Sequence, residues 1–519
     1  MTRWHAALGA AGAVALVTVA ARVVGFGRVA VLSRTLGTSC VGDTYTAVNA
    51  LPNVVYEVVA GGALAAFVVP VLAGAVAAGD RDAVSRTTSA LLTWTLLVLV
   101  PVAFAGALAA PLLVRALLGD DPSCRGAVEV GSRMLVVFMP QVALYGVGIV
   151  LAGVLQAHRR FLGPALAPLL SSLVVVTAYL LYAAGGAVDE LAELSRRAEL
   201  VLSVGTTLGV AVLSLSLLVP LRSCGLRLRP ALRFPPGVAA RARRLAAGGV
   251  LGLAAQQLAL LVALRLAANG GQGSVVVFTV ATALFLLPWA VLAVPVATSA
   301  FPTLTAAADR GDASGYAAEL GRALRPVVLA MSGAAALLAV GAGPAALLLV
   351  RGAPGLERSG ELARATAAFA PGLVGYGLLA LLVRAAWARG DARTPATATA
   401  LGWLTVAGTD LALVTALPQA ERGVLLGVGN TVGVTVAALV LLLHLRRTAG
   451  RSALTGATRS AAAGAGAAGA AVGLGAALTW VLPDGRVAVG LAVTAVAAAV
   501  WLAVARLLDP SGLQELRRA

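Results

Sequence analysis

The chain has 519 residues, of which 60% are hydrophobic and only 12% are charged, and its formal net charge is +17. A water-soluble chain would carry about 25% charged residues, so this composition excludes an ordinary soluble protein and favours one that crosses a membrane many times. All 39 basic residues are arginine, and a chain without lysine cannot form a Walker A phosphate loop. The three cysteines and three histidines match no metal-site spacing. We therefore expect no cofactor, no metal site and no enzymatic activity.

Apolar runs recur along the whole chain, and each is long enough to cross about 30 Å of hydrocarbon. Between charged breaks they predict fourteen transmembrane helices, and the first run is too long for a cleavable signal peptide. The predicted spans are 8–33, 44–75, 87–113, 132–156, 163–185, 199–221, 245–268, 274–305, 322–350, 362–387, 395–417, 422–445, 460–482 and 486–507. The predicted fold is an all-α polytopic membrane protein.

The loops between these spans alternate in charge. One set is rich in arginine, as at Arg81 and Arg86, whereas the alternate loops balance their arginines with acids such as Asp189 and Glu190. Cytoplasmic loops carry the excess of basic residues. The alternation therefore predicts that the protein lies in the cytoplasmic membrane with both termini in the cytoplasm, and that its positive charge is a topology signal rather than a nucleic-acid surface.

The same orientation places Cys40 and Cys124 on the outer side of the membrane and Cys224 inside. An oxidising outer compartment would allow a disulfide between the first two. We expect unpaired, inert cysteines rather than this disulfide.

Two segments repeat the same pattern six predicted helices apart. "PVLAGAVAAGD" (70–80) and "PTLTAAADRGD" (302–312) share the proline, the leucine and the Gly-Asp pair at identical spacing. The repeat predicts two pseudo-symmetric six-helix bundles in parallel orientation, a transporter plan in which the substrate site lies at the interface of the repeats. The predicted bundles are residues 1–222 and 245–445, joined by a basic cytoplasmic linker, 223–244, and followed by two additional helices and a tail in 446–519.

Three arginines, Arg22, Arg28 and Arg34, interrupt the first span. An arginine at the bilayer centre costs about 2.5–3.5 kcal/mol on insertion scales, so it should face a cavity or a partner. Snorkelling to the interface accounts for Arg34, whereas the deeper Arg22 indicates a functional position. Gly25 and Gly27 could bend the helix there and turn Arg22 and Arg28 toward one cavity. Two guanidinium groups would suit a phosphate or pyrophosphate head group.

The second span adds the polar residues Asp43, Asn53 and Glu57 around Pro52. Pro52 frees a backbone carbonyl in mid-membrane, which needs a cavity or a neighbouring helix to satisfy it. Asp43 either belongs to the cavity or simply favours the start of the helix. Glu57 is an acid deep in the span and a candidate counter-ion for the arginines of the first span.

In the second half, Asp410 lies near the middle of the eleventh span. An isolated ionised carboxylate there would be costly, so it is protonated, bound to an ion or hydrogen-bonded. Thr431 and Thr435 share one face of the twelfth span because they are four residues apart. These three residues predict a coupling site for H⁺ or Na⁺, and a structural hydrogen bond from Asp410 to a neighbouring helix is the alternative.

The first two spans resemble a known family. "RVVGFGR" (22–28), "SRTLG" (33–37), "GDTYTAVNALPNVV" (42–55) and "GALAAFVVPVL" (62–72) look like the opening helices of the MurJ/MviN lipid II flippases, members of the multidrug/oligosaccharidyl-lipid/polysaccharide exporter superfamily. The resemblance implies export of an undecaprenyl-pyrophosphate-linked peptidoglycan precursor by alternating access, driven by an ion gradient or the membrane potential. It places Arg22, Arg28 and Asp43 on charged cavity positions and Asn53 on the family's Leu-Pro-Asn turn.

The sequence also departs from that family. Val29 stands where an acid is usual, Tyr56 stands where an arginine is usual, and the eighth span is uncharged, with Ala283 or a neighbour in the place of an arginine. Glu57 adds a negative charge. Two of the cations expected to hold the pyrophosphate are therefore missing, which favours a divergent member of the family.

Three functions are consistent with these patterns. A flippase for lipid II or another polyprenyl-linked glycan predicts that Arg22 and Arg28 are essential. An ion-coupled exporter of small amphiphiles predicts that Asp410 or Glu57 matters more, and a non-transporting scaffold for cell-wall proteins predicts tolerance at every one of these positions. The expected partners are a lipid-linked pyrophosphate substrate, membrane lipids, H⁺ or Na⁺, and cell-wall synthesis proteins, but no nucleic acid.

Overall fold

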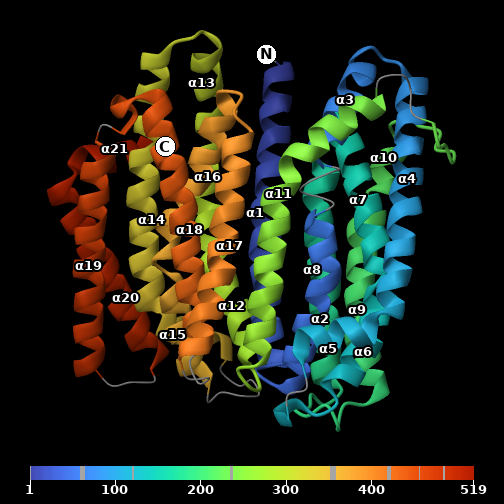
Figure 1. Ribbon diagram of the computed structural model, residues 1–519, viewed down its shortest axis with the longest axis horizontal. Coiled ribbons are helices and arrows are strands. Elements are labelled where there is room, and N and C mark those ends of the chain that lie inside the picture. The colour runs from blue at the N-terminus through green and yellow to red at the C-terminus, as the bar shows by residue number, and fades with distance from the viewer. Residues whose placement is uncertain are drawn as a thin grey trace. The chain divides into compact units, whose positions relative to one another are not determined.

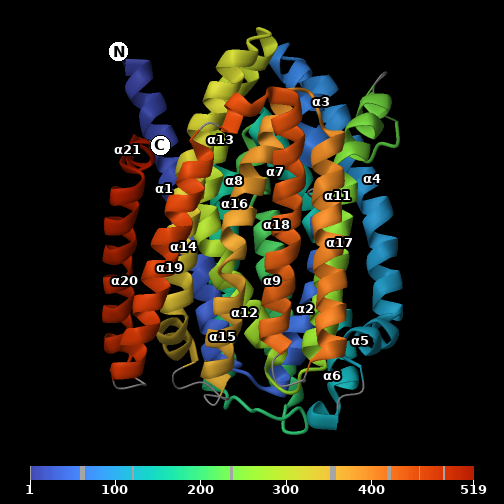
Figure 2. The ribbon, with the colours of Figure 1, turned by 60° about the vertical axis from the view of Figure 1, so that its left-hand side comes forward.

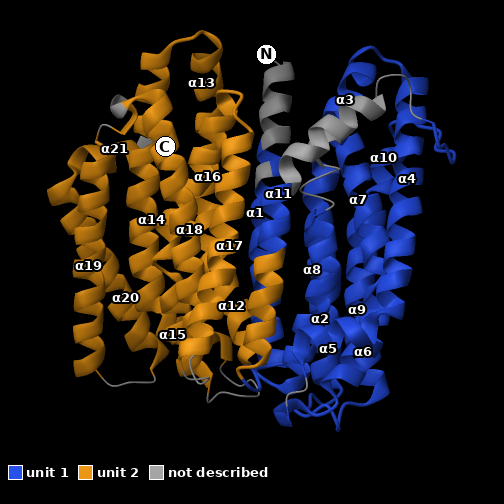
Figure 3. Ribbon diagram, in the orientation of Figure 1, with its two compact units in different colours: residues 1–257, 271–273 blue, residues 258–270, 274–519 orange. Residues whose placement is uncertain are grey.

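The computed structural model describes residues 2–58, 65–119, 122–233, 238–350, 358–417, 422–454, 456–482 and 486–518, and in these ranges every regular element is a helix (Figure 1). The chain divides into two compact units, residues 1–257 with 271–273 and residues 258–270 with 274–519 (Figure 3). Each unit has its own helical core, and each is described by itself below.

Within its described residues, the first unit contains ten α-helices and the first part of an eleventh. They are α1 (Thr2–Thr35), α2 (Cys40–Glu57), α3 (Ala65–Ala77), α4 (Arg81–Leu108), α5 (Ala110–Leu118), α6 (Ala127–Phe138), α7 (Pro140–Ala157), α8 (Leu162–Ala184), α9 (Arg196–Leu215), α10 (Leu218–Arg222) and α11 (Val238–Ala268). Helix α8 packs between α1 and α9, and α7 packs along α3, α4 and α9. Val150, Leu151, Val154 and Leu155 lie on one face of α7 because they recur at helical spacing, and all four are fully buried in the core of this unit.

The second unit contains the remaining helices (Figure 2). They are α12 (Ser274–Pro288), a π-helical turn (Trp289–Ala293), α13 (Val294–Asp309), α14 (Ala313–Val350), α15 (Ser359–Phe369), α16 (Gly372–Ala388), α17 (Arg393–Ala416), α18 (Arg422–Ala449), α19 (Ala457–Val481), α20 (Val487–Leu508) and α21 (Pro510–Arg518). Helices α17 and α18 pack closely along each other, α18 also packs on α15 and α16, and α19 and α20 pack on α14.

The structure confirms a multi-pass, all-helical membrane protein. Twelve segments of the described chain are long and apolar enough to cross a membrane, and α15 with α16, bent by 44°, would make a thirteenth. The remaining predicted span, 44–75, falls on α2 and α3, and residues 59–64 between these helices lie outside the described ranges. The count of fourteen therefore stays a prediction.

The two copies of the repeated segment have the same local structure. Gly79 and Gly311 both adopt the left-handed region, with φ of 69° and 68°, and so end α3 and α13 in the same turn. Asp80 and Asp312 follow, and each accepts a 2.8 Å hydrogen bond from the backbone N–H three residues later, at the start of α4 and α14. In both copies the glycine therefore ends one helix and the aspartate caps the start of the next.

A related turn joins α16 to α17. Gly390 has a φ of 75°, and the carboxylate of Asp391 accepts a 3.0 Å hydrogen bond from the Thr394 N–H and lies 3.0 Å from His444 Nε2. Burial alone would raise the pKa of Asp391, but the hydrogen bonds from Thr394 and the charge of His444 outweigh burial and hold that pKa below its usual value.

The structure corrects the expectation about the cysteines. Cys40 and Cys124 form a disulfide, with their Cα atoms 5.4 Å apart. Cys40 begins α2 and Cys124 ends a short 3₁₀ turn before α6, and the packing of α2 against α5 and α6 brings the two together. Their separation of 84 positions in the sequence hid this proximity. Cys224 is a half-buried thiol, and burial raises its pKa.

Candidate functional site

The arginines of the first span lie on α1, which runs without interruption from Thr2 to Thr35. The side chain of Arg22 is exposed and that of Arg28 is half-buried. A Cβ atom added at Gly25 or Gly27 would meet no atom within 4 Å. These glycines are therefore not needed for close helix packing, and there is open space beside α1 at both of them.

A cluster of tyrosines that was not expected from the sequence lies within range of the Arg28 charge. Its members are Tyr45, Tyr145 and Tyr179. The Tyr45 hydroxyl is 3.0 Å from the Tyr179 hydroxyl and 2.6 Å from Thr206 Oγ1, and all three groups are buried. These residues come from α2, α7, α8 and α9, so no local sequence pattern could have revealed that they meet.

The cluster continues to Asn53. Tyr145 donates a 2.7 Å hydrogen bond to Asn53 Oδ1, while Asn53 Nδ2 donates to the Asn49 carbonyl at 2.7 Å. The ring of Tyr56, the residue at the position of a family arginine, lies 4.4 Å from the ring of Tyr145. A pocket of about 220 Å³ is lined by these two rings together with α7, α8 and α9. Aromatic groups thus form the wall where the resemblance implied a cation.

The two acids predicted for this site occupy different environments. Asp43 is buried in the first turn of α2, and its Oδ2 accepts a 2.5 Å hydrogen bond from the Gly273 N–H. Ser39, rather than Asp43, caps the helix by accepting from the Gly42 N–H. Glu57 is exposed at the end of α2. The ion pairs found among the described residues do not include the expected one between Glu57 and the arginines of α1.

In the second unit, Asp410 is buried on α17, with 1% of its surface exposed, and neither of its carboxylate oxygens has a hydrogen-bond partner within the described residues. Its Oδ1 packs against Gly429 of α18, where a Cβ atom could not fit. The expected structural hydrogen bond to a neighbouring helix is therefore not what holds this side chain. A buried acid in such surroundings must be protonated or must bind a cation.

The structure does not bring the two predicted threonines to Asp410. Thr431 Oγ1 donates to the Ala368 carbonyl of α15 at 3.0 Å, and Thr435 Oγ1 donates to the Thr431 carbonyl at 2.7 Å. Gly372 and Gly375 of α16 lie against these threonines. The threonines therefore face α15 and α16, whereas Asp410 packs against the side of α18 that faces α17.

A second group of charges, not anticipated from the sequence, lies between α6 and α9. Glu199 is 1% exposed and accepts hydrogen bonds from Arg133, the shortest of them 2.8 Å, and from Arg196. Arg133 also pairs with Glu129 at 2.7 Å. The i, i+4 spacing of Glu129 and Arg133 and the i, i+3 spacing of Arg196 and Glu199 were the local signals of this network.

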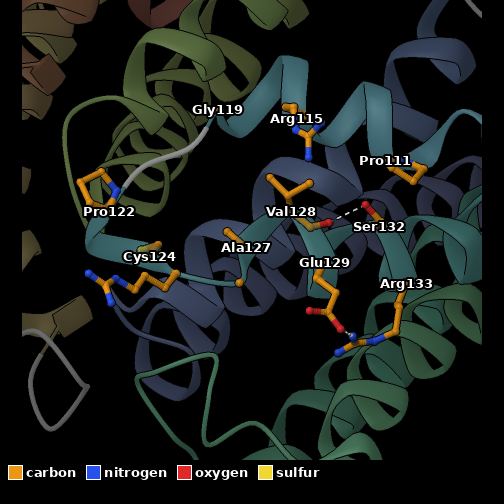
Figure 4. Close-up of a pocket in the computed structure, with 12 residues that line it drawn as sticks. Pro111, Arg115, Gly119, Pro122, Cys124, Ala127, Val128, Glu129, Ser132 and Arg133 are labelled. Atoms are coloured by element: carbon orange, nitrogen blue, oxygen red, sulfur yellow. Dashed lines mark hydrogen bonds and ion pairs between the residues drawn. The ribbon is translucent and has the colours of Figure 1, made fainter.

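A pocket of about 660 Å³ lies next to these charges and to the disulfide, between α5, α6 and the segment that joins them (Figure 4). The Glu129–Arg133 pair borders it on one side, and Cys124 borders it on the other.

Comparison with known proteins gives consistent matches along the chain. The sequence model of a family described as "Lipid II flippase MurJ" matches residues 32–498. The lipid II flippase MurJ of Burkholderia cenocepacia is 29% identical over 452 residues, which cover 83% of this chain and 82% of that protein.

Two solved structures share the fold. A lipid II flippase MurJ in an inward closed conformation matches with a TM-score of 0.73 at 14% identity, over 95% of this chain and 98% of that one. An inward-facing multidrug resistance transporter of the MATE family, in the MOP superfamily, matches with a TM-score of 0.68 at 18% identity, over 83% of this chain and 94% of that one.

Proposed function

The chain belongs to the lipid II flippase MurJ family, and from this premise we propose that it moves lipid II across the cytoplasmic membrane by alternating access. Lipid II is an undecaprenyl-pyrophosphate-linked peptidoglycan precursor, so the activity is transport of a lipid-linked glycan without a covalent step. The alternation of arginine-rich loops supports an orientation with both termini in the cytoplasm.

Arg22 and Arg28 are the residues that we assign to the pyrophosphate. The observation that carries this assignment is the open surroundings of α1 here: Arg22 is exposed, Arg28 is half-buried, and a Cβ atom added at either glycine between them would meet no atom within 4 Å. Six residues of helix correspond to a rise of about 9 Å, which two long arginine side chains can bridge to reach neighbouring phosphates. Guanidinium groups bind phosphate oxygens in pairs of parallel hydrogen bonds.

Asn53 and Asp43 support this site in different ways. Asn53 is held by Tyr145 at one end and by its own helix at the other, which fixes this turn of α2. Asp43 anchors the segment before α12 through Gly273. Glu57 is exposed at the C-terminal end of α2. Its negative charge would repel a pyrophosphate that lay too close to that end of the helix.

The missing cations set the expected strength of binding. Tyr56 replaces one arginine with an aromatic ring that stacks on Tyr145, and α12 carries no charge at all. Each charge-assisted hydrogen bond is worth about 1.5–3 kcal/mol, so losing two weakens the hold on the pyrophosphate by a factor of roughly a hundred to ten thousand. We propose that Arg22 and Arg28 supply the remaining affinity by themselves.

Asp410 is the proposed site of ion coupling. A protonated carboxyl can remain buried without a partner at moderate cost, whereas the ionised form needs a cation. Binding and release of H⁺ or Na⁺ at this residue would therefore change the charge of the α17–α18 pair. The hydroxyl groups of Thr431 and Thr435 already donate to carbonyls, so in this conformation Asp410 would act without them.

Reconstituted vesicles provide the test. The full-length protein is placed in liposomes that contain fluorescent lipid II, and the fraction of lipid II accessible from outside is followed with time. We expect wild type to move lipid II, Arg22→Ala to move it at least tenfold more slowly, and a matched control, Arg447→Ala at the exposed end of α18, to behave as wild type. Equal rates for wild type and Arg22→Ala would contradict the assignment.

The same vesicles separate the coupling proposal from the substrate proposal. With an imposed proton or sodium gradient, Asp410→Asn should lose the acceleration by the gradient but keep the slow movement seen without one. If the gradient still accelerated lipid II movement by the Asp410→Asn variant, the coupling role of Asp410 would be refuted, and the role of the arginines would be unaffected.

A further inference from the structure

An extended segment lies along the outside of α4 in the first unit, seen as the green trace beside α4 in Figure 1. We call residues 225–233, with the sequence GLRLRPALR, the basic strap. Alternate backbone N–H groups of the strap donate to hydroxyl groups spaced four residues apart on α4: Arg227 to Ser85 at 3.2 Å, Arg229 to Ser89 at 3.1 Å and Ala231 to Thr93 at 3.0 Å. Trp94 Nε1 closes the series by donating to the Leu232 carbonyl at 2.9 Å.

The regularity of these bonds follows from two repeats that nearly match. Four residues of an α-helix rise by about 6 Å, and two residues of an extended chain rise by about 6.6 Å. A serine or threonine every fourth residue on α4 can therefore meet every second N–H of a strand that runs in the same direction. The hydroxyl ladder, Ser85, Ser89 and Thr93, fixes the register of the strap.

A fixed register makes the strap amphipathic. Side chains of an extended chain alternate between its two faces. One face carries leucines, of which Leu226 packs against the core of the unit while Leu228 and Leu232 are 37% and 60% exposed. The other face carries three exposed arginines: Arg227, Arg229 and Arg233.

The position of the strap on α4 places both faces near a membrane surface. Helix α4 is a candidate membrane span that begins at Arg81, so the ladder begins about 6 Å and ends about 18 Å into the helix. Trp94, which holds the end of the strap, is 42% exposed, as is typical of tryptophans at the border between head groups and hydrocarbon. The predicted span starts at residue 87, so the strap begins on the head-group side of this border and ends about 9 Å beyond it. Long arginine side chains can extend back from that depth to the head-group phosphates.

We propose that the basic strap is a binding site for anionic phospholipids of the leaflet at the N-terminal end of α4, which the proposed orientation makes the cytoplasmic leaflet. The exposed leucines contact acyl chains, and the arginines bind head-group phosphates. Membrane surfaces that carry anionic lipid attract clustered arginines next to a span. This site is separate from Arg22 and Arg28, and the inference holds whatever substrate the protein transports.

The hydroxyl ladder distinguishes a binding site from a topology signal. A topology signal requires only that basic residues stand in a short loop, and it does not require that the loop be held in one conformation. Replacing the three hydroxyl groups keeps every charge but frees the strap, so a topology signal would be unaffected while a site built from three aligned arginines would be lost.

The experiment measures how lipids shift the thermal unfolding of the purified full-length protein in neutral detergent. Phosphatidylglycerol and phosphatidylcholine are titrated separately, and glycerol phosphate provides the soluble head group without chains. The arginine variant is Arg227→Gln/Arg229→Gln/Arg233→Gln, and the ladder variant is Ser85→Ala/Ser89→Ala/Thr93→Val. The matched control, Arg310→Gln/Arg446→Gln/Arg447→Gln, removes three exposed arginines elsewhere.

For wild type we expect phosphatidylglycerol to raise the unfolding temperature more than phosphatidylcholine, and glycerol phosphate to have no effect. The apparent affinity for phosphatidylglycerol should fall about a hundredfold in the arginine variant. It should fall roughly tenfold in the ladder variant, because its arginines are no longer aligned. In the control it should change little. Four outcomes would overturn the proposal: no preference for phosphatidylglycerol in wild type, an unchanged preference in either strap variant, an equal loss in the control, or an equal shift with glycerol phosphate.

Discussion

The seam between α17 and α18 provides the sharpest prediction about packing. Gly402 and Gly433 face each other there, and a Cβ atom on Gly433 would lie 2.5 Å from the Gly402 carbonyl oxygen and 2.7 Å from the Val406 backbone nitrogen. Because both neighbours are backbone atoms, no side-chain rotation can relieve the contact. Gly433→Ala should therefore force the two helices apart, and with them the buried Asp410.

The size of the effect follows from two opposing contributions. Overpacking a close contact costs about 1–3 kcal/mol, and the upper part of that range applies because the backbone cannot yield. Alanine in place of glycine in a helix returns about 0.5–1 kcal/mol. We expect a net loss of about 2 kcal/mol for Gly433→Ala. Gly408 of α17 is the matched control, because a Cβ atom there meets nothing within 4 Å, so Gly408→Ala should be neutral or stabilising by up to about 1 kcal/mol.

Thermal unfolding of the purified variants in one detergent measures this difference. The predicted order of unfolding temperatures is Gly408→Ala equal to or above wild type, and wild type above Gly433→Ala. If Gly433→Ala unfolded at or above the temperature of wild type, the close approach of α17 and α18 would be refuted.

Three further predictions concern the stability of other regions. Removing the disulfide with Cys40→Ser/Cys124→Ser should lower the free energy of unfolding by up to about 4–5 kcal/mol for a loop of this length, and with it the unfolding temperature. Reductant should lower the unfolding temperature of wild type but not that of the variant. Arg133→Gln leaves the buried Glu199 with one partner fewer. It should lower the free energy of unfolding by about 2–3 kcal/mol, less than the loss expected for a completely unpaired buried charge. In a double-mutant cycle, adding Glu199→Gln should restore part of that free energy. The pKa of Asp391 is lowered in the folded state. Its ionised carboxylate therefore stabilises the fold above the ordinary pKa of an aspartate, and this stabilisation is lost as pH falls through the lowered pKa. Asp391→Asn should consequently make the free energy of unfolding less dependent on pH in the acid range.

The membrane spans could be predicted from the sequence because the bilayer imposes a local rule. Each run of about twenty apolar residues satisfies its own backbone as a helix, and no knowledge of the neighbours is needed. The repeated Gly-Asp turns were predictable for the same reason, since Gly79 and Asp80 act within one turn of chain. The short helices α5, α6 and α15 were less evident, because bends inside an apolar run leave its composition unchanged.

The site could be predicted only in part. Charges inside apolar runs pointed to Arg22, Arg28 and Asp410, because a buried charge is costly wherever the neighbours lie. The partners of these charges could not be predicted, since they depend on which helices pack together. The disulfide between Cys40 and Cys124 and the tyrosine cluster within range of the Arg28 charge both join segments far apart in the chain.

The packing of the basic strap on α4 also could not be predicted from the sequence, although both of its parts were visible there. Its arginines were visible in the sequence as part of the linker, and their charge was interpreted as a topology signal. The serine and threonine ladder at 85, 89 and 93 was also visible, but hydroxyl groups every fourth residue are common in helices and bond to their own backbone. Only the packing of the linker on α4 revealed that the two patterns fit each other.

The central claim is that this divergent member still flips lipid II with only two arginines for the pyrophosphate. The most direct measurement is rescue of growth in cells depleted of their own lipid II flippase, with wild type, Arg22→Ala and the control Arg447→Ala expressed at equal membrane levels. We predict growth with wild type and the control and no growth with Arg22→Ala. Absence of growth with wild type present in the membrane, or equal growth with Arg22→Ala, would contradict the claim.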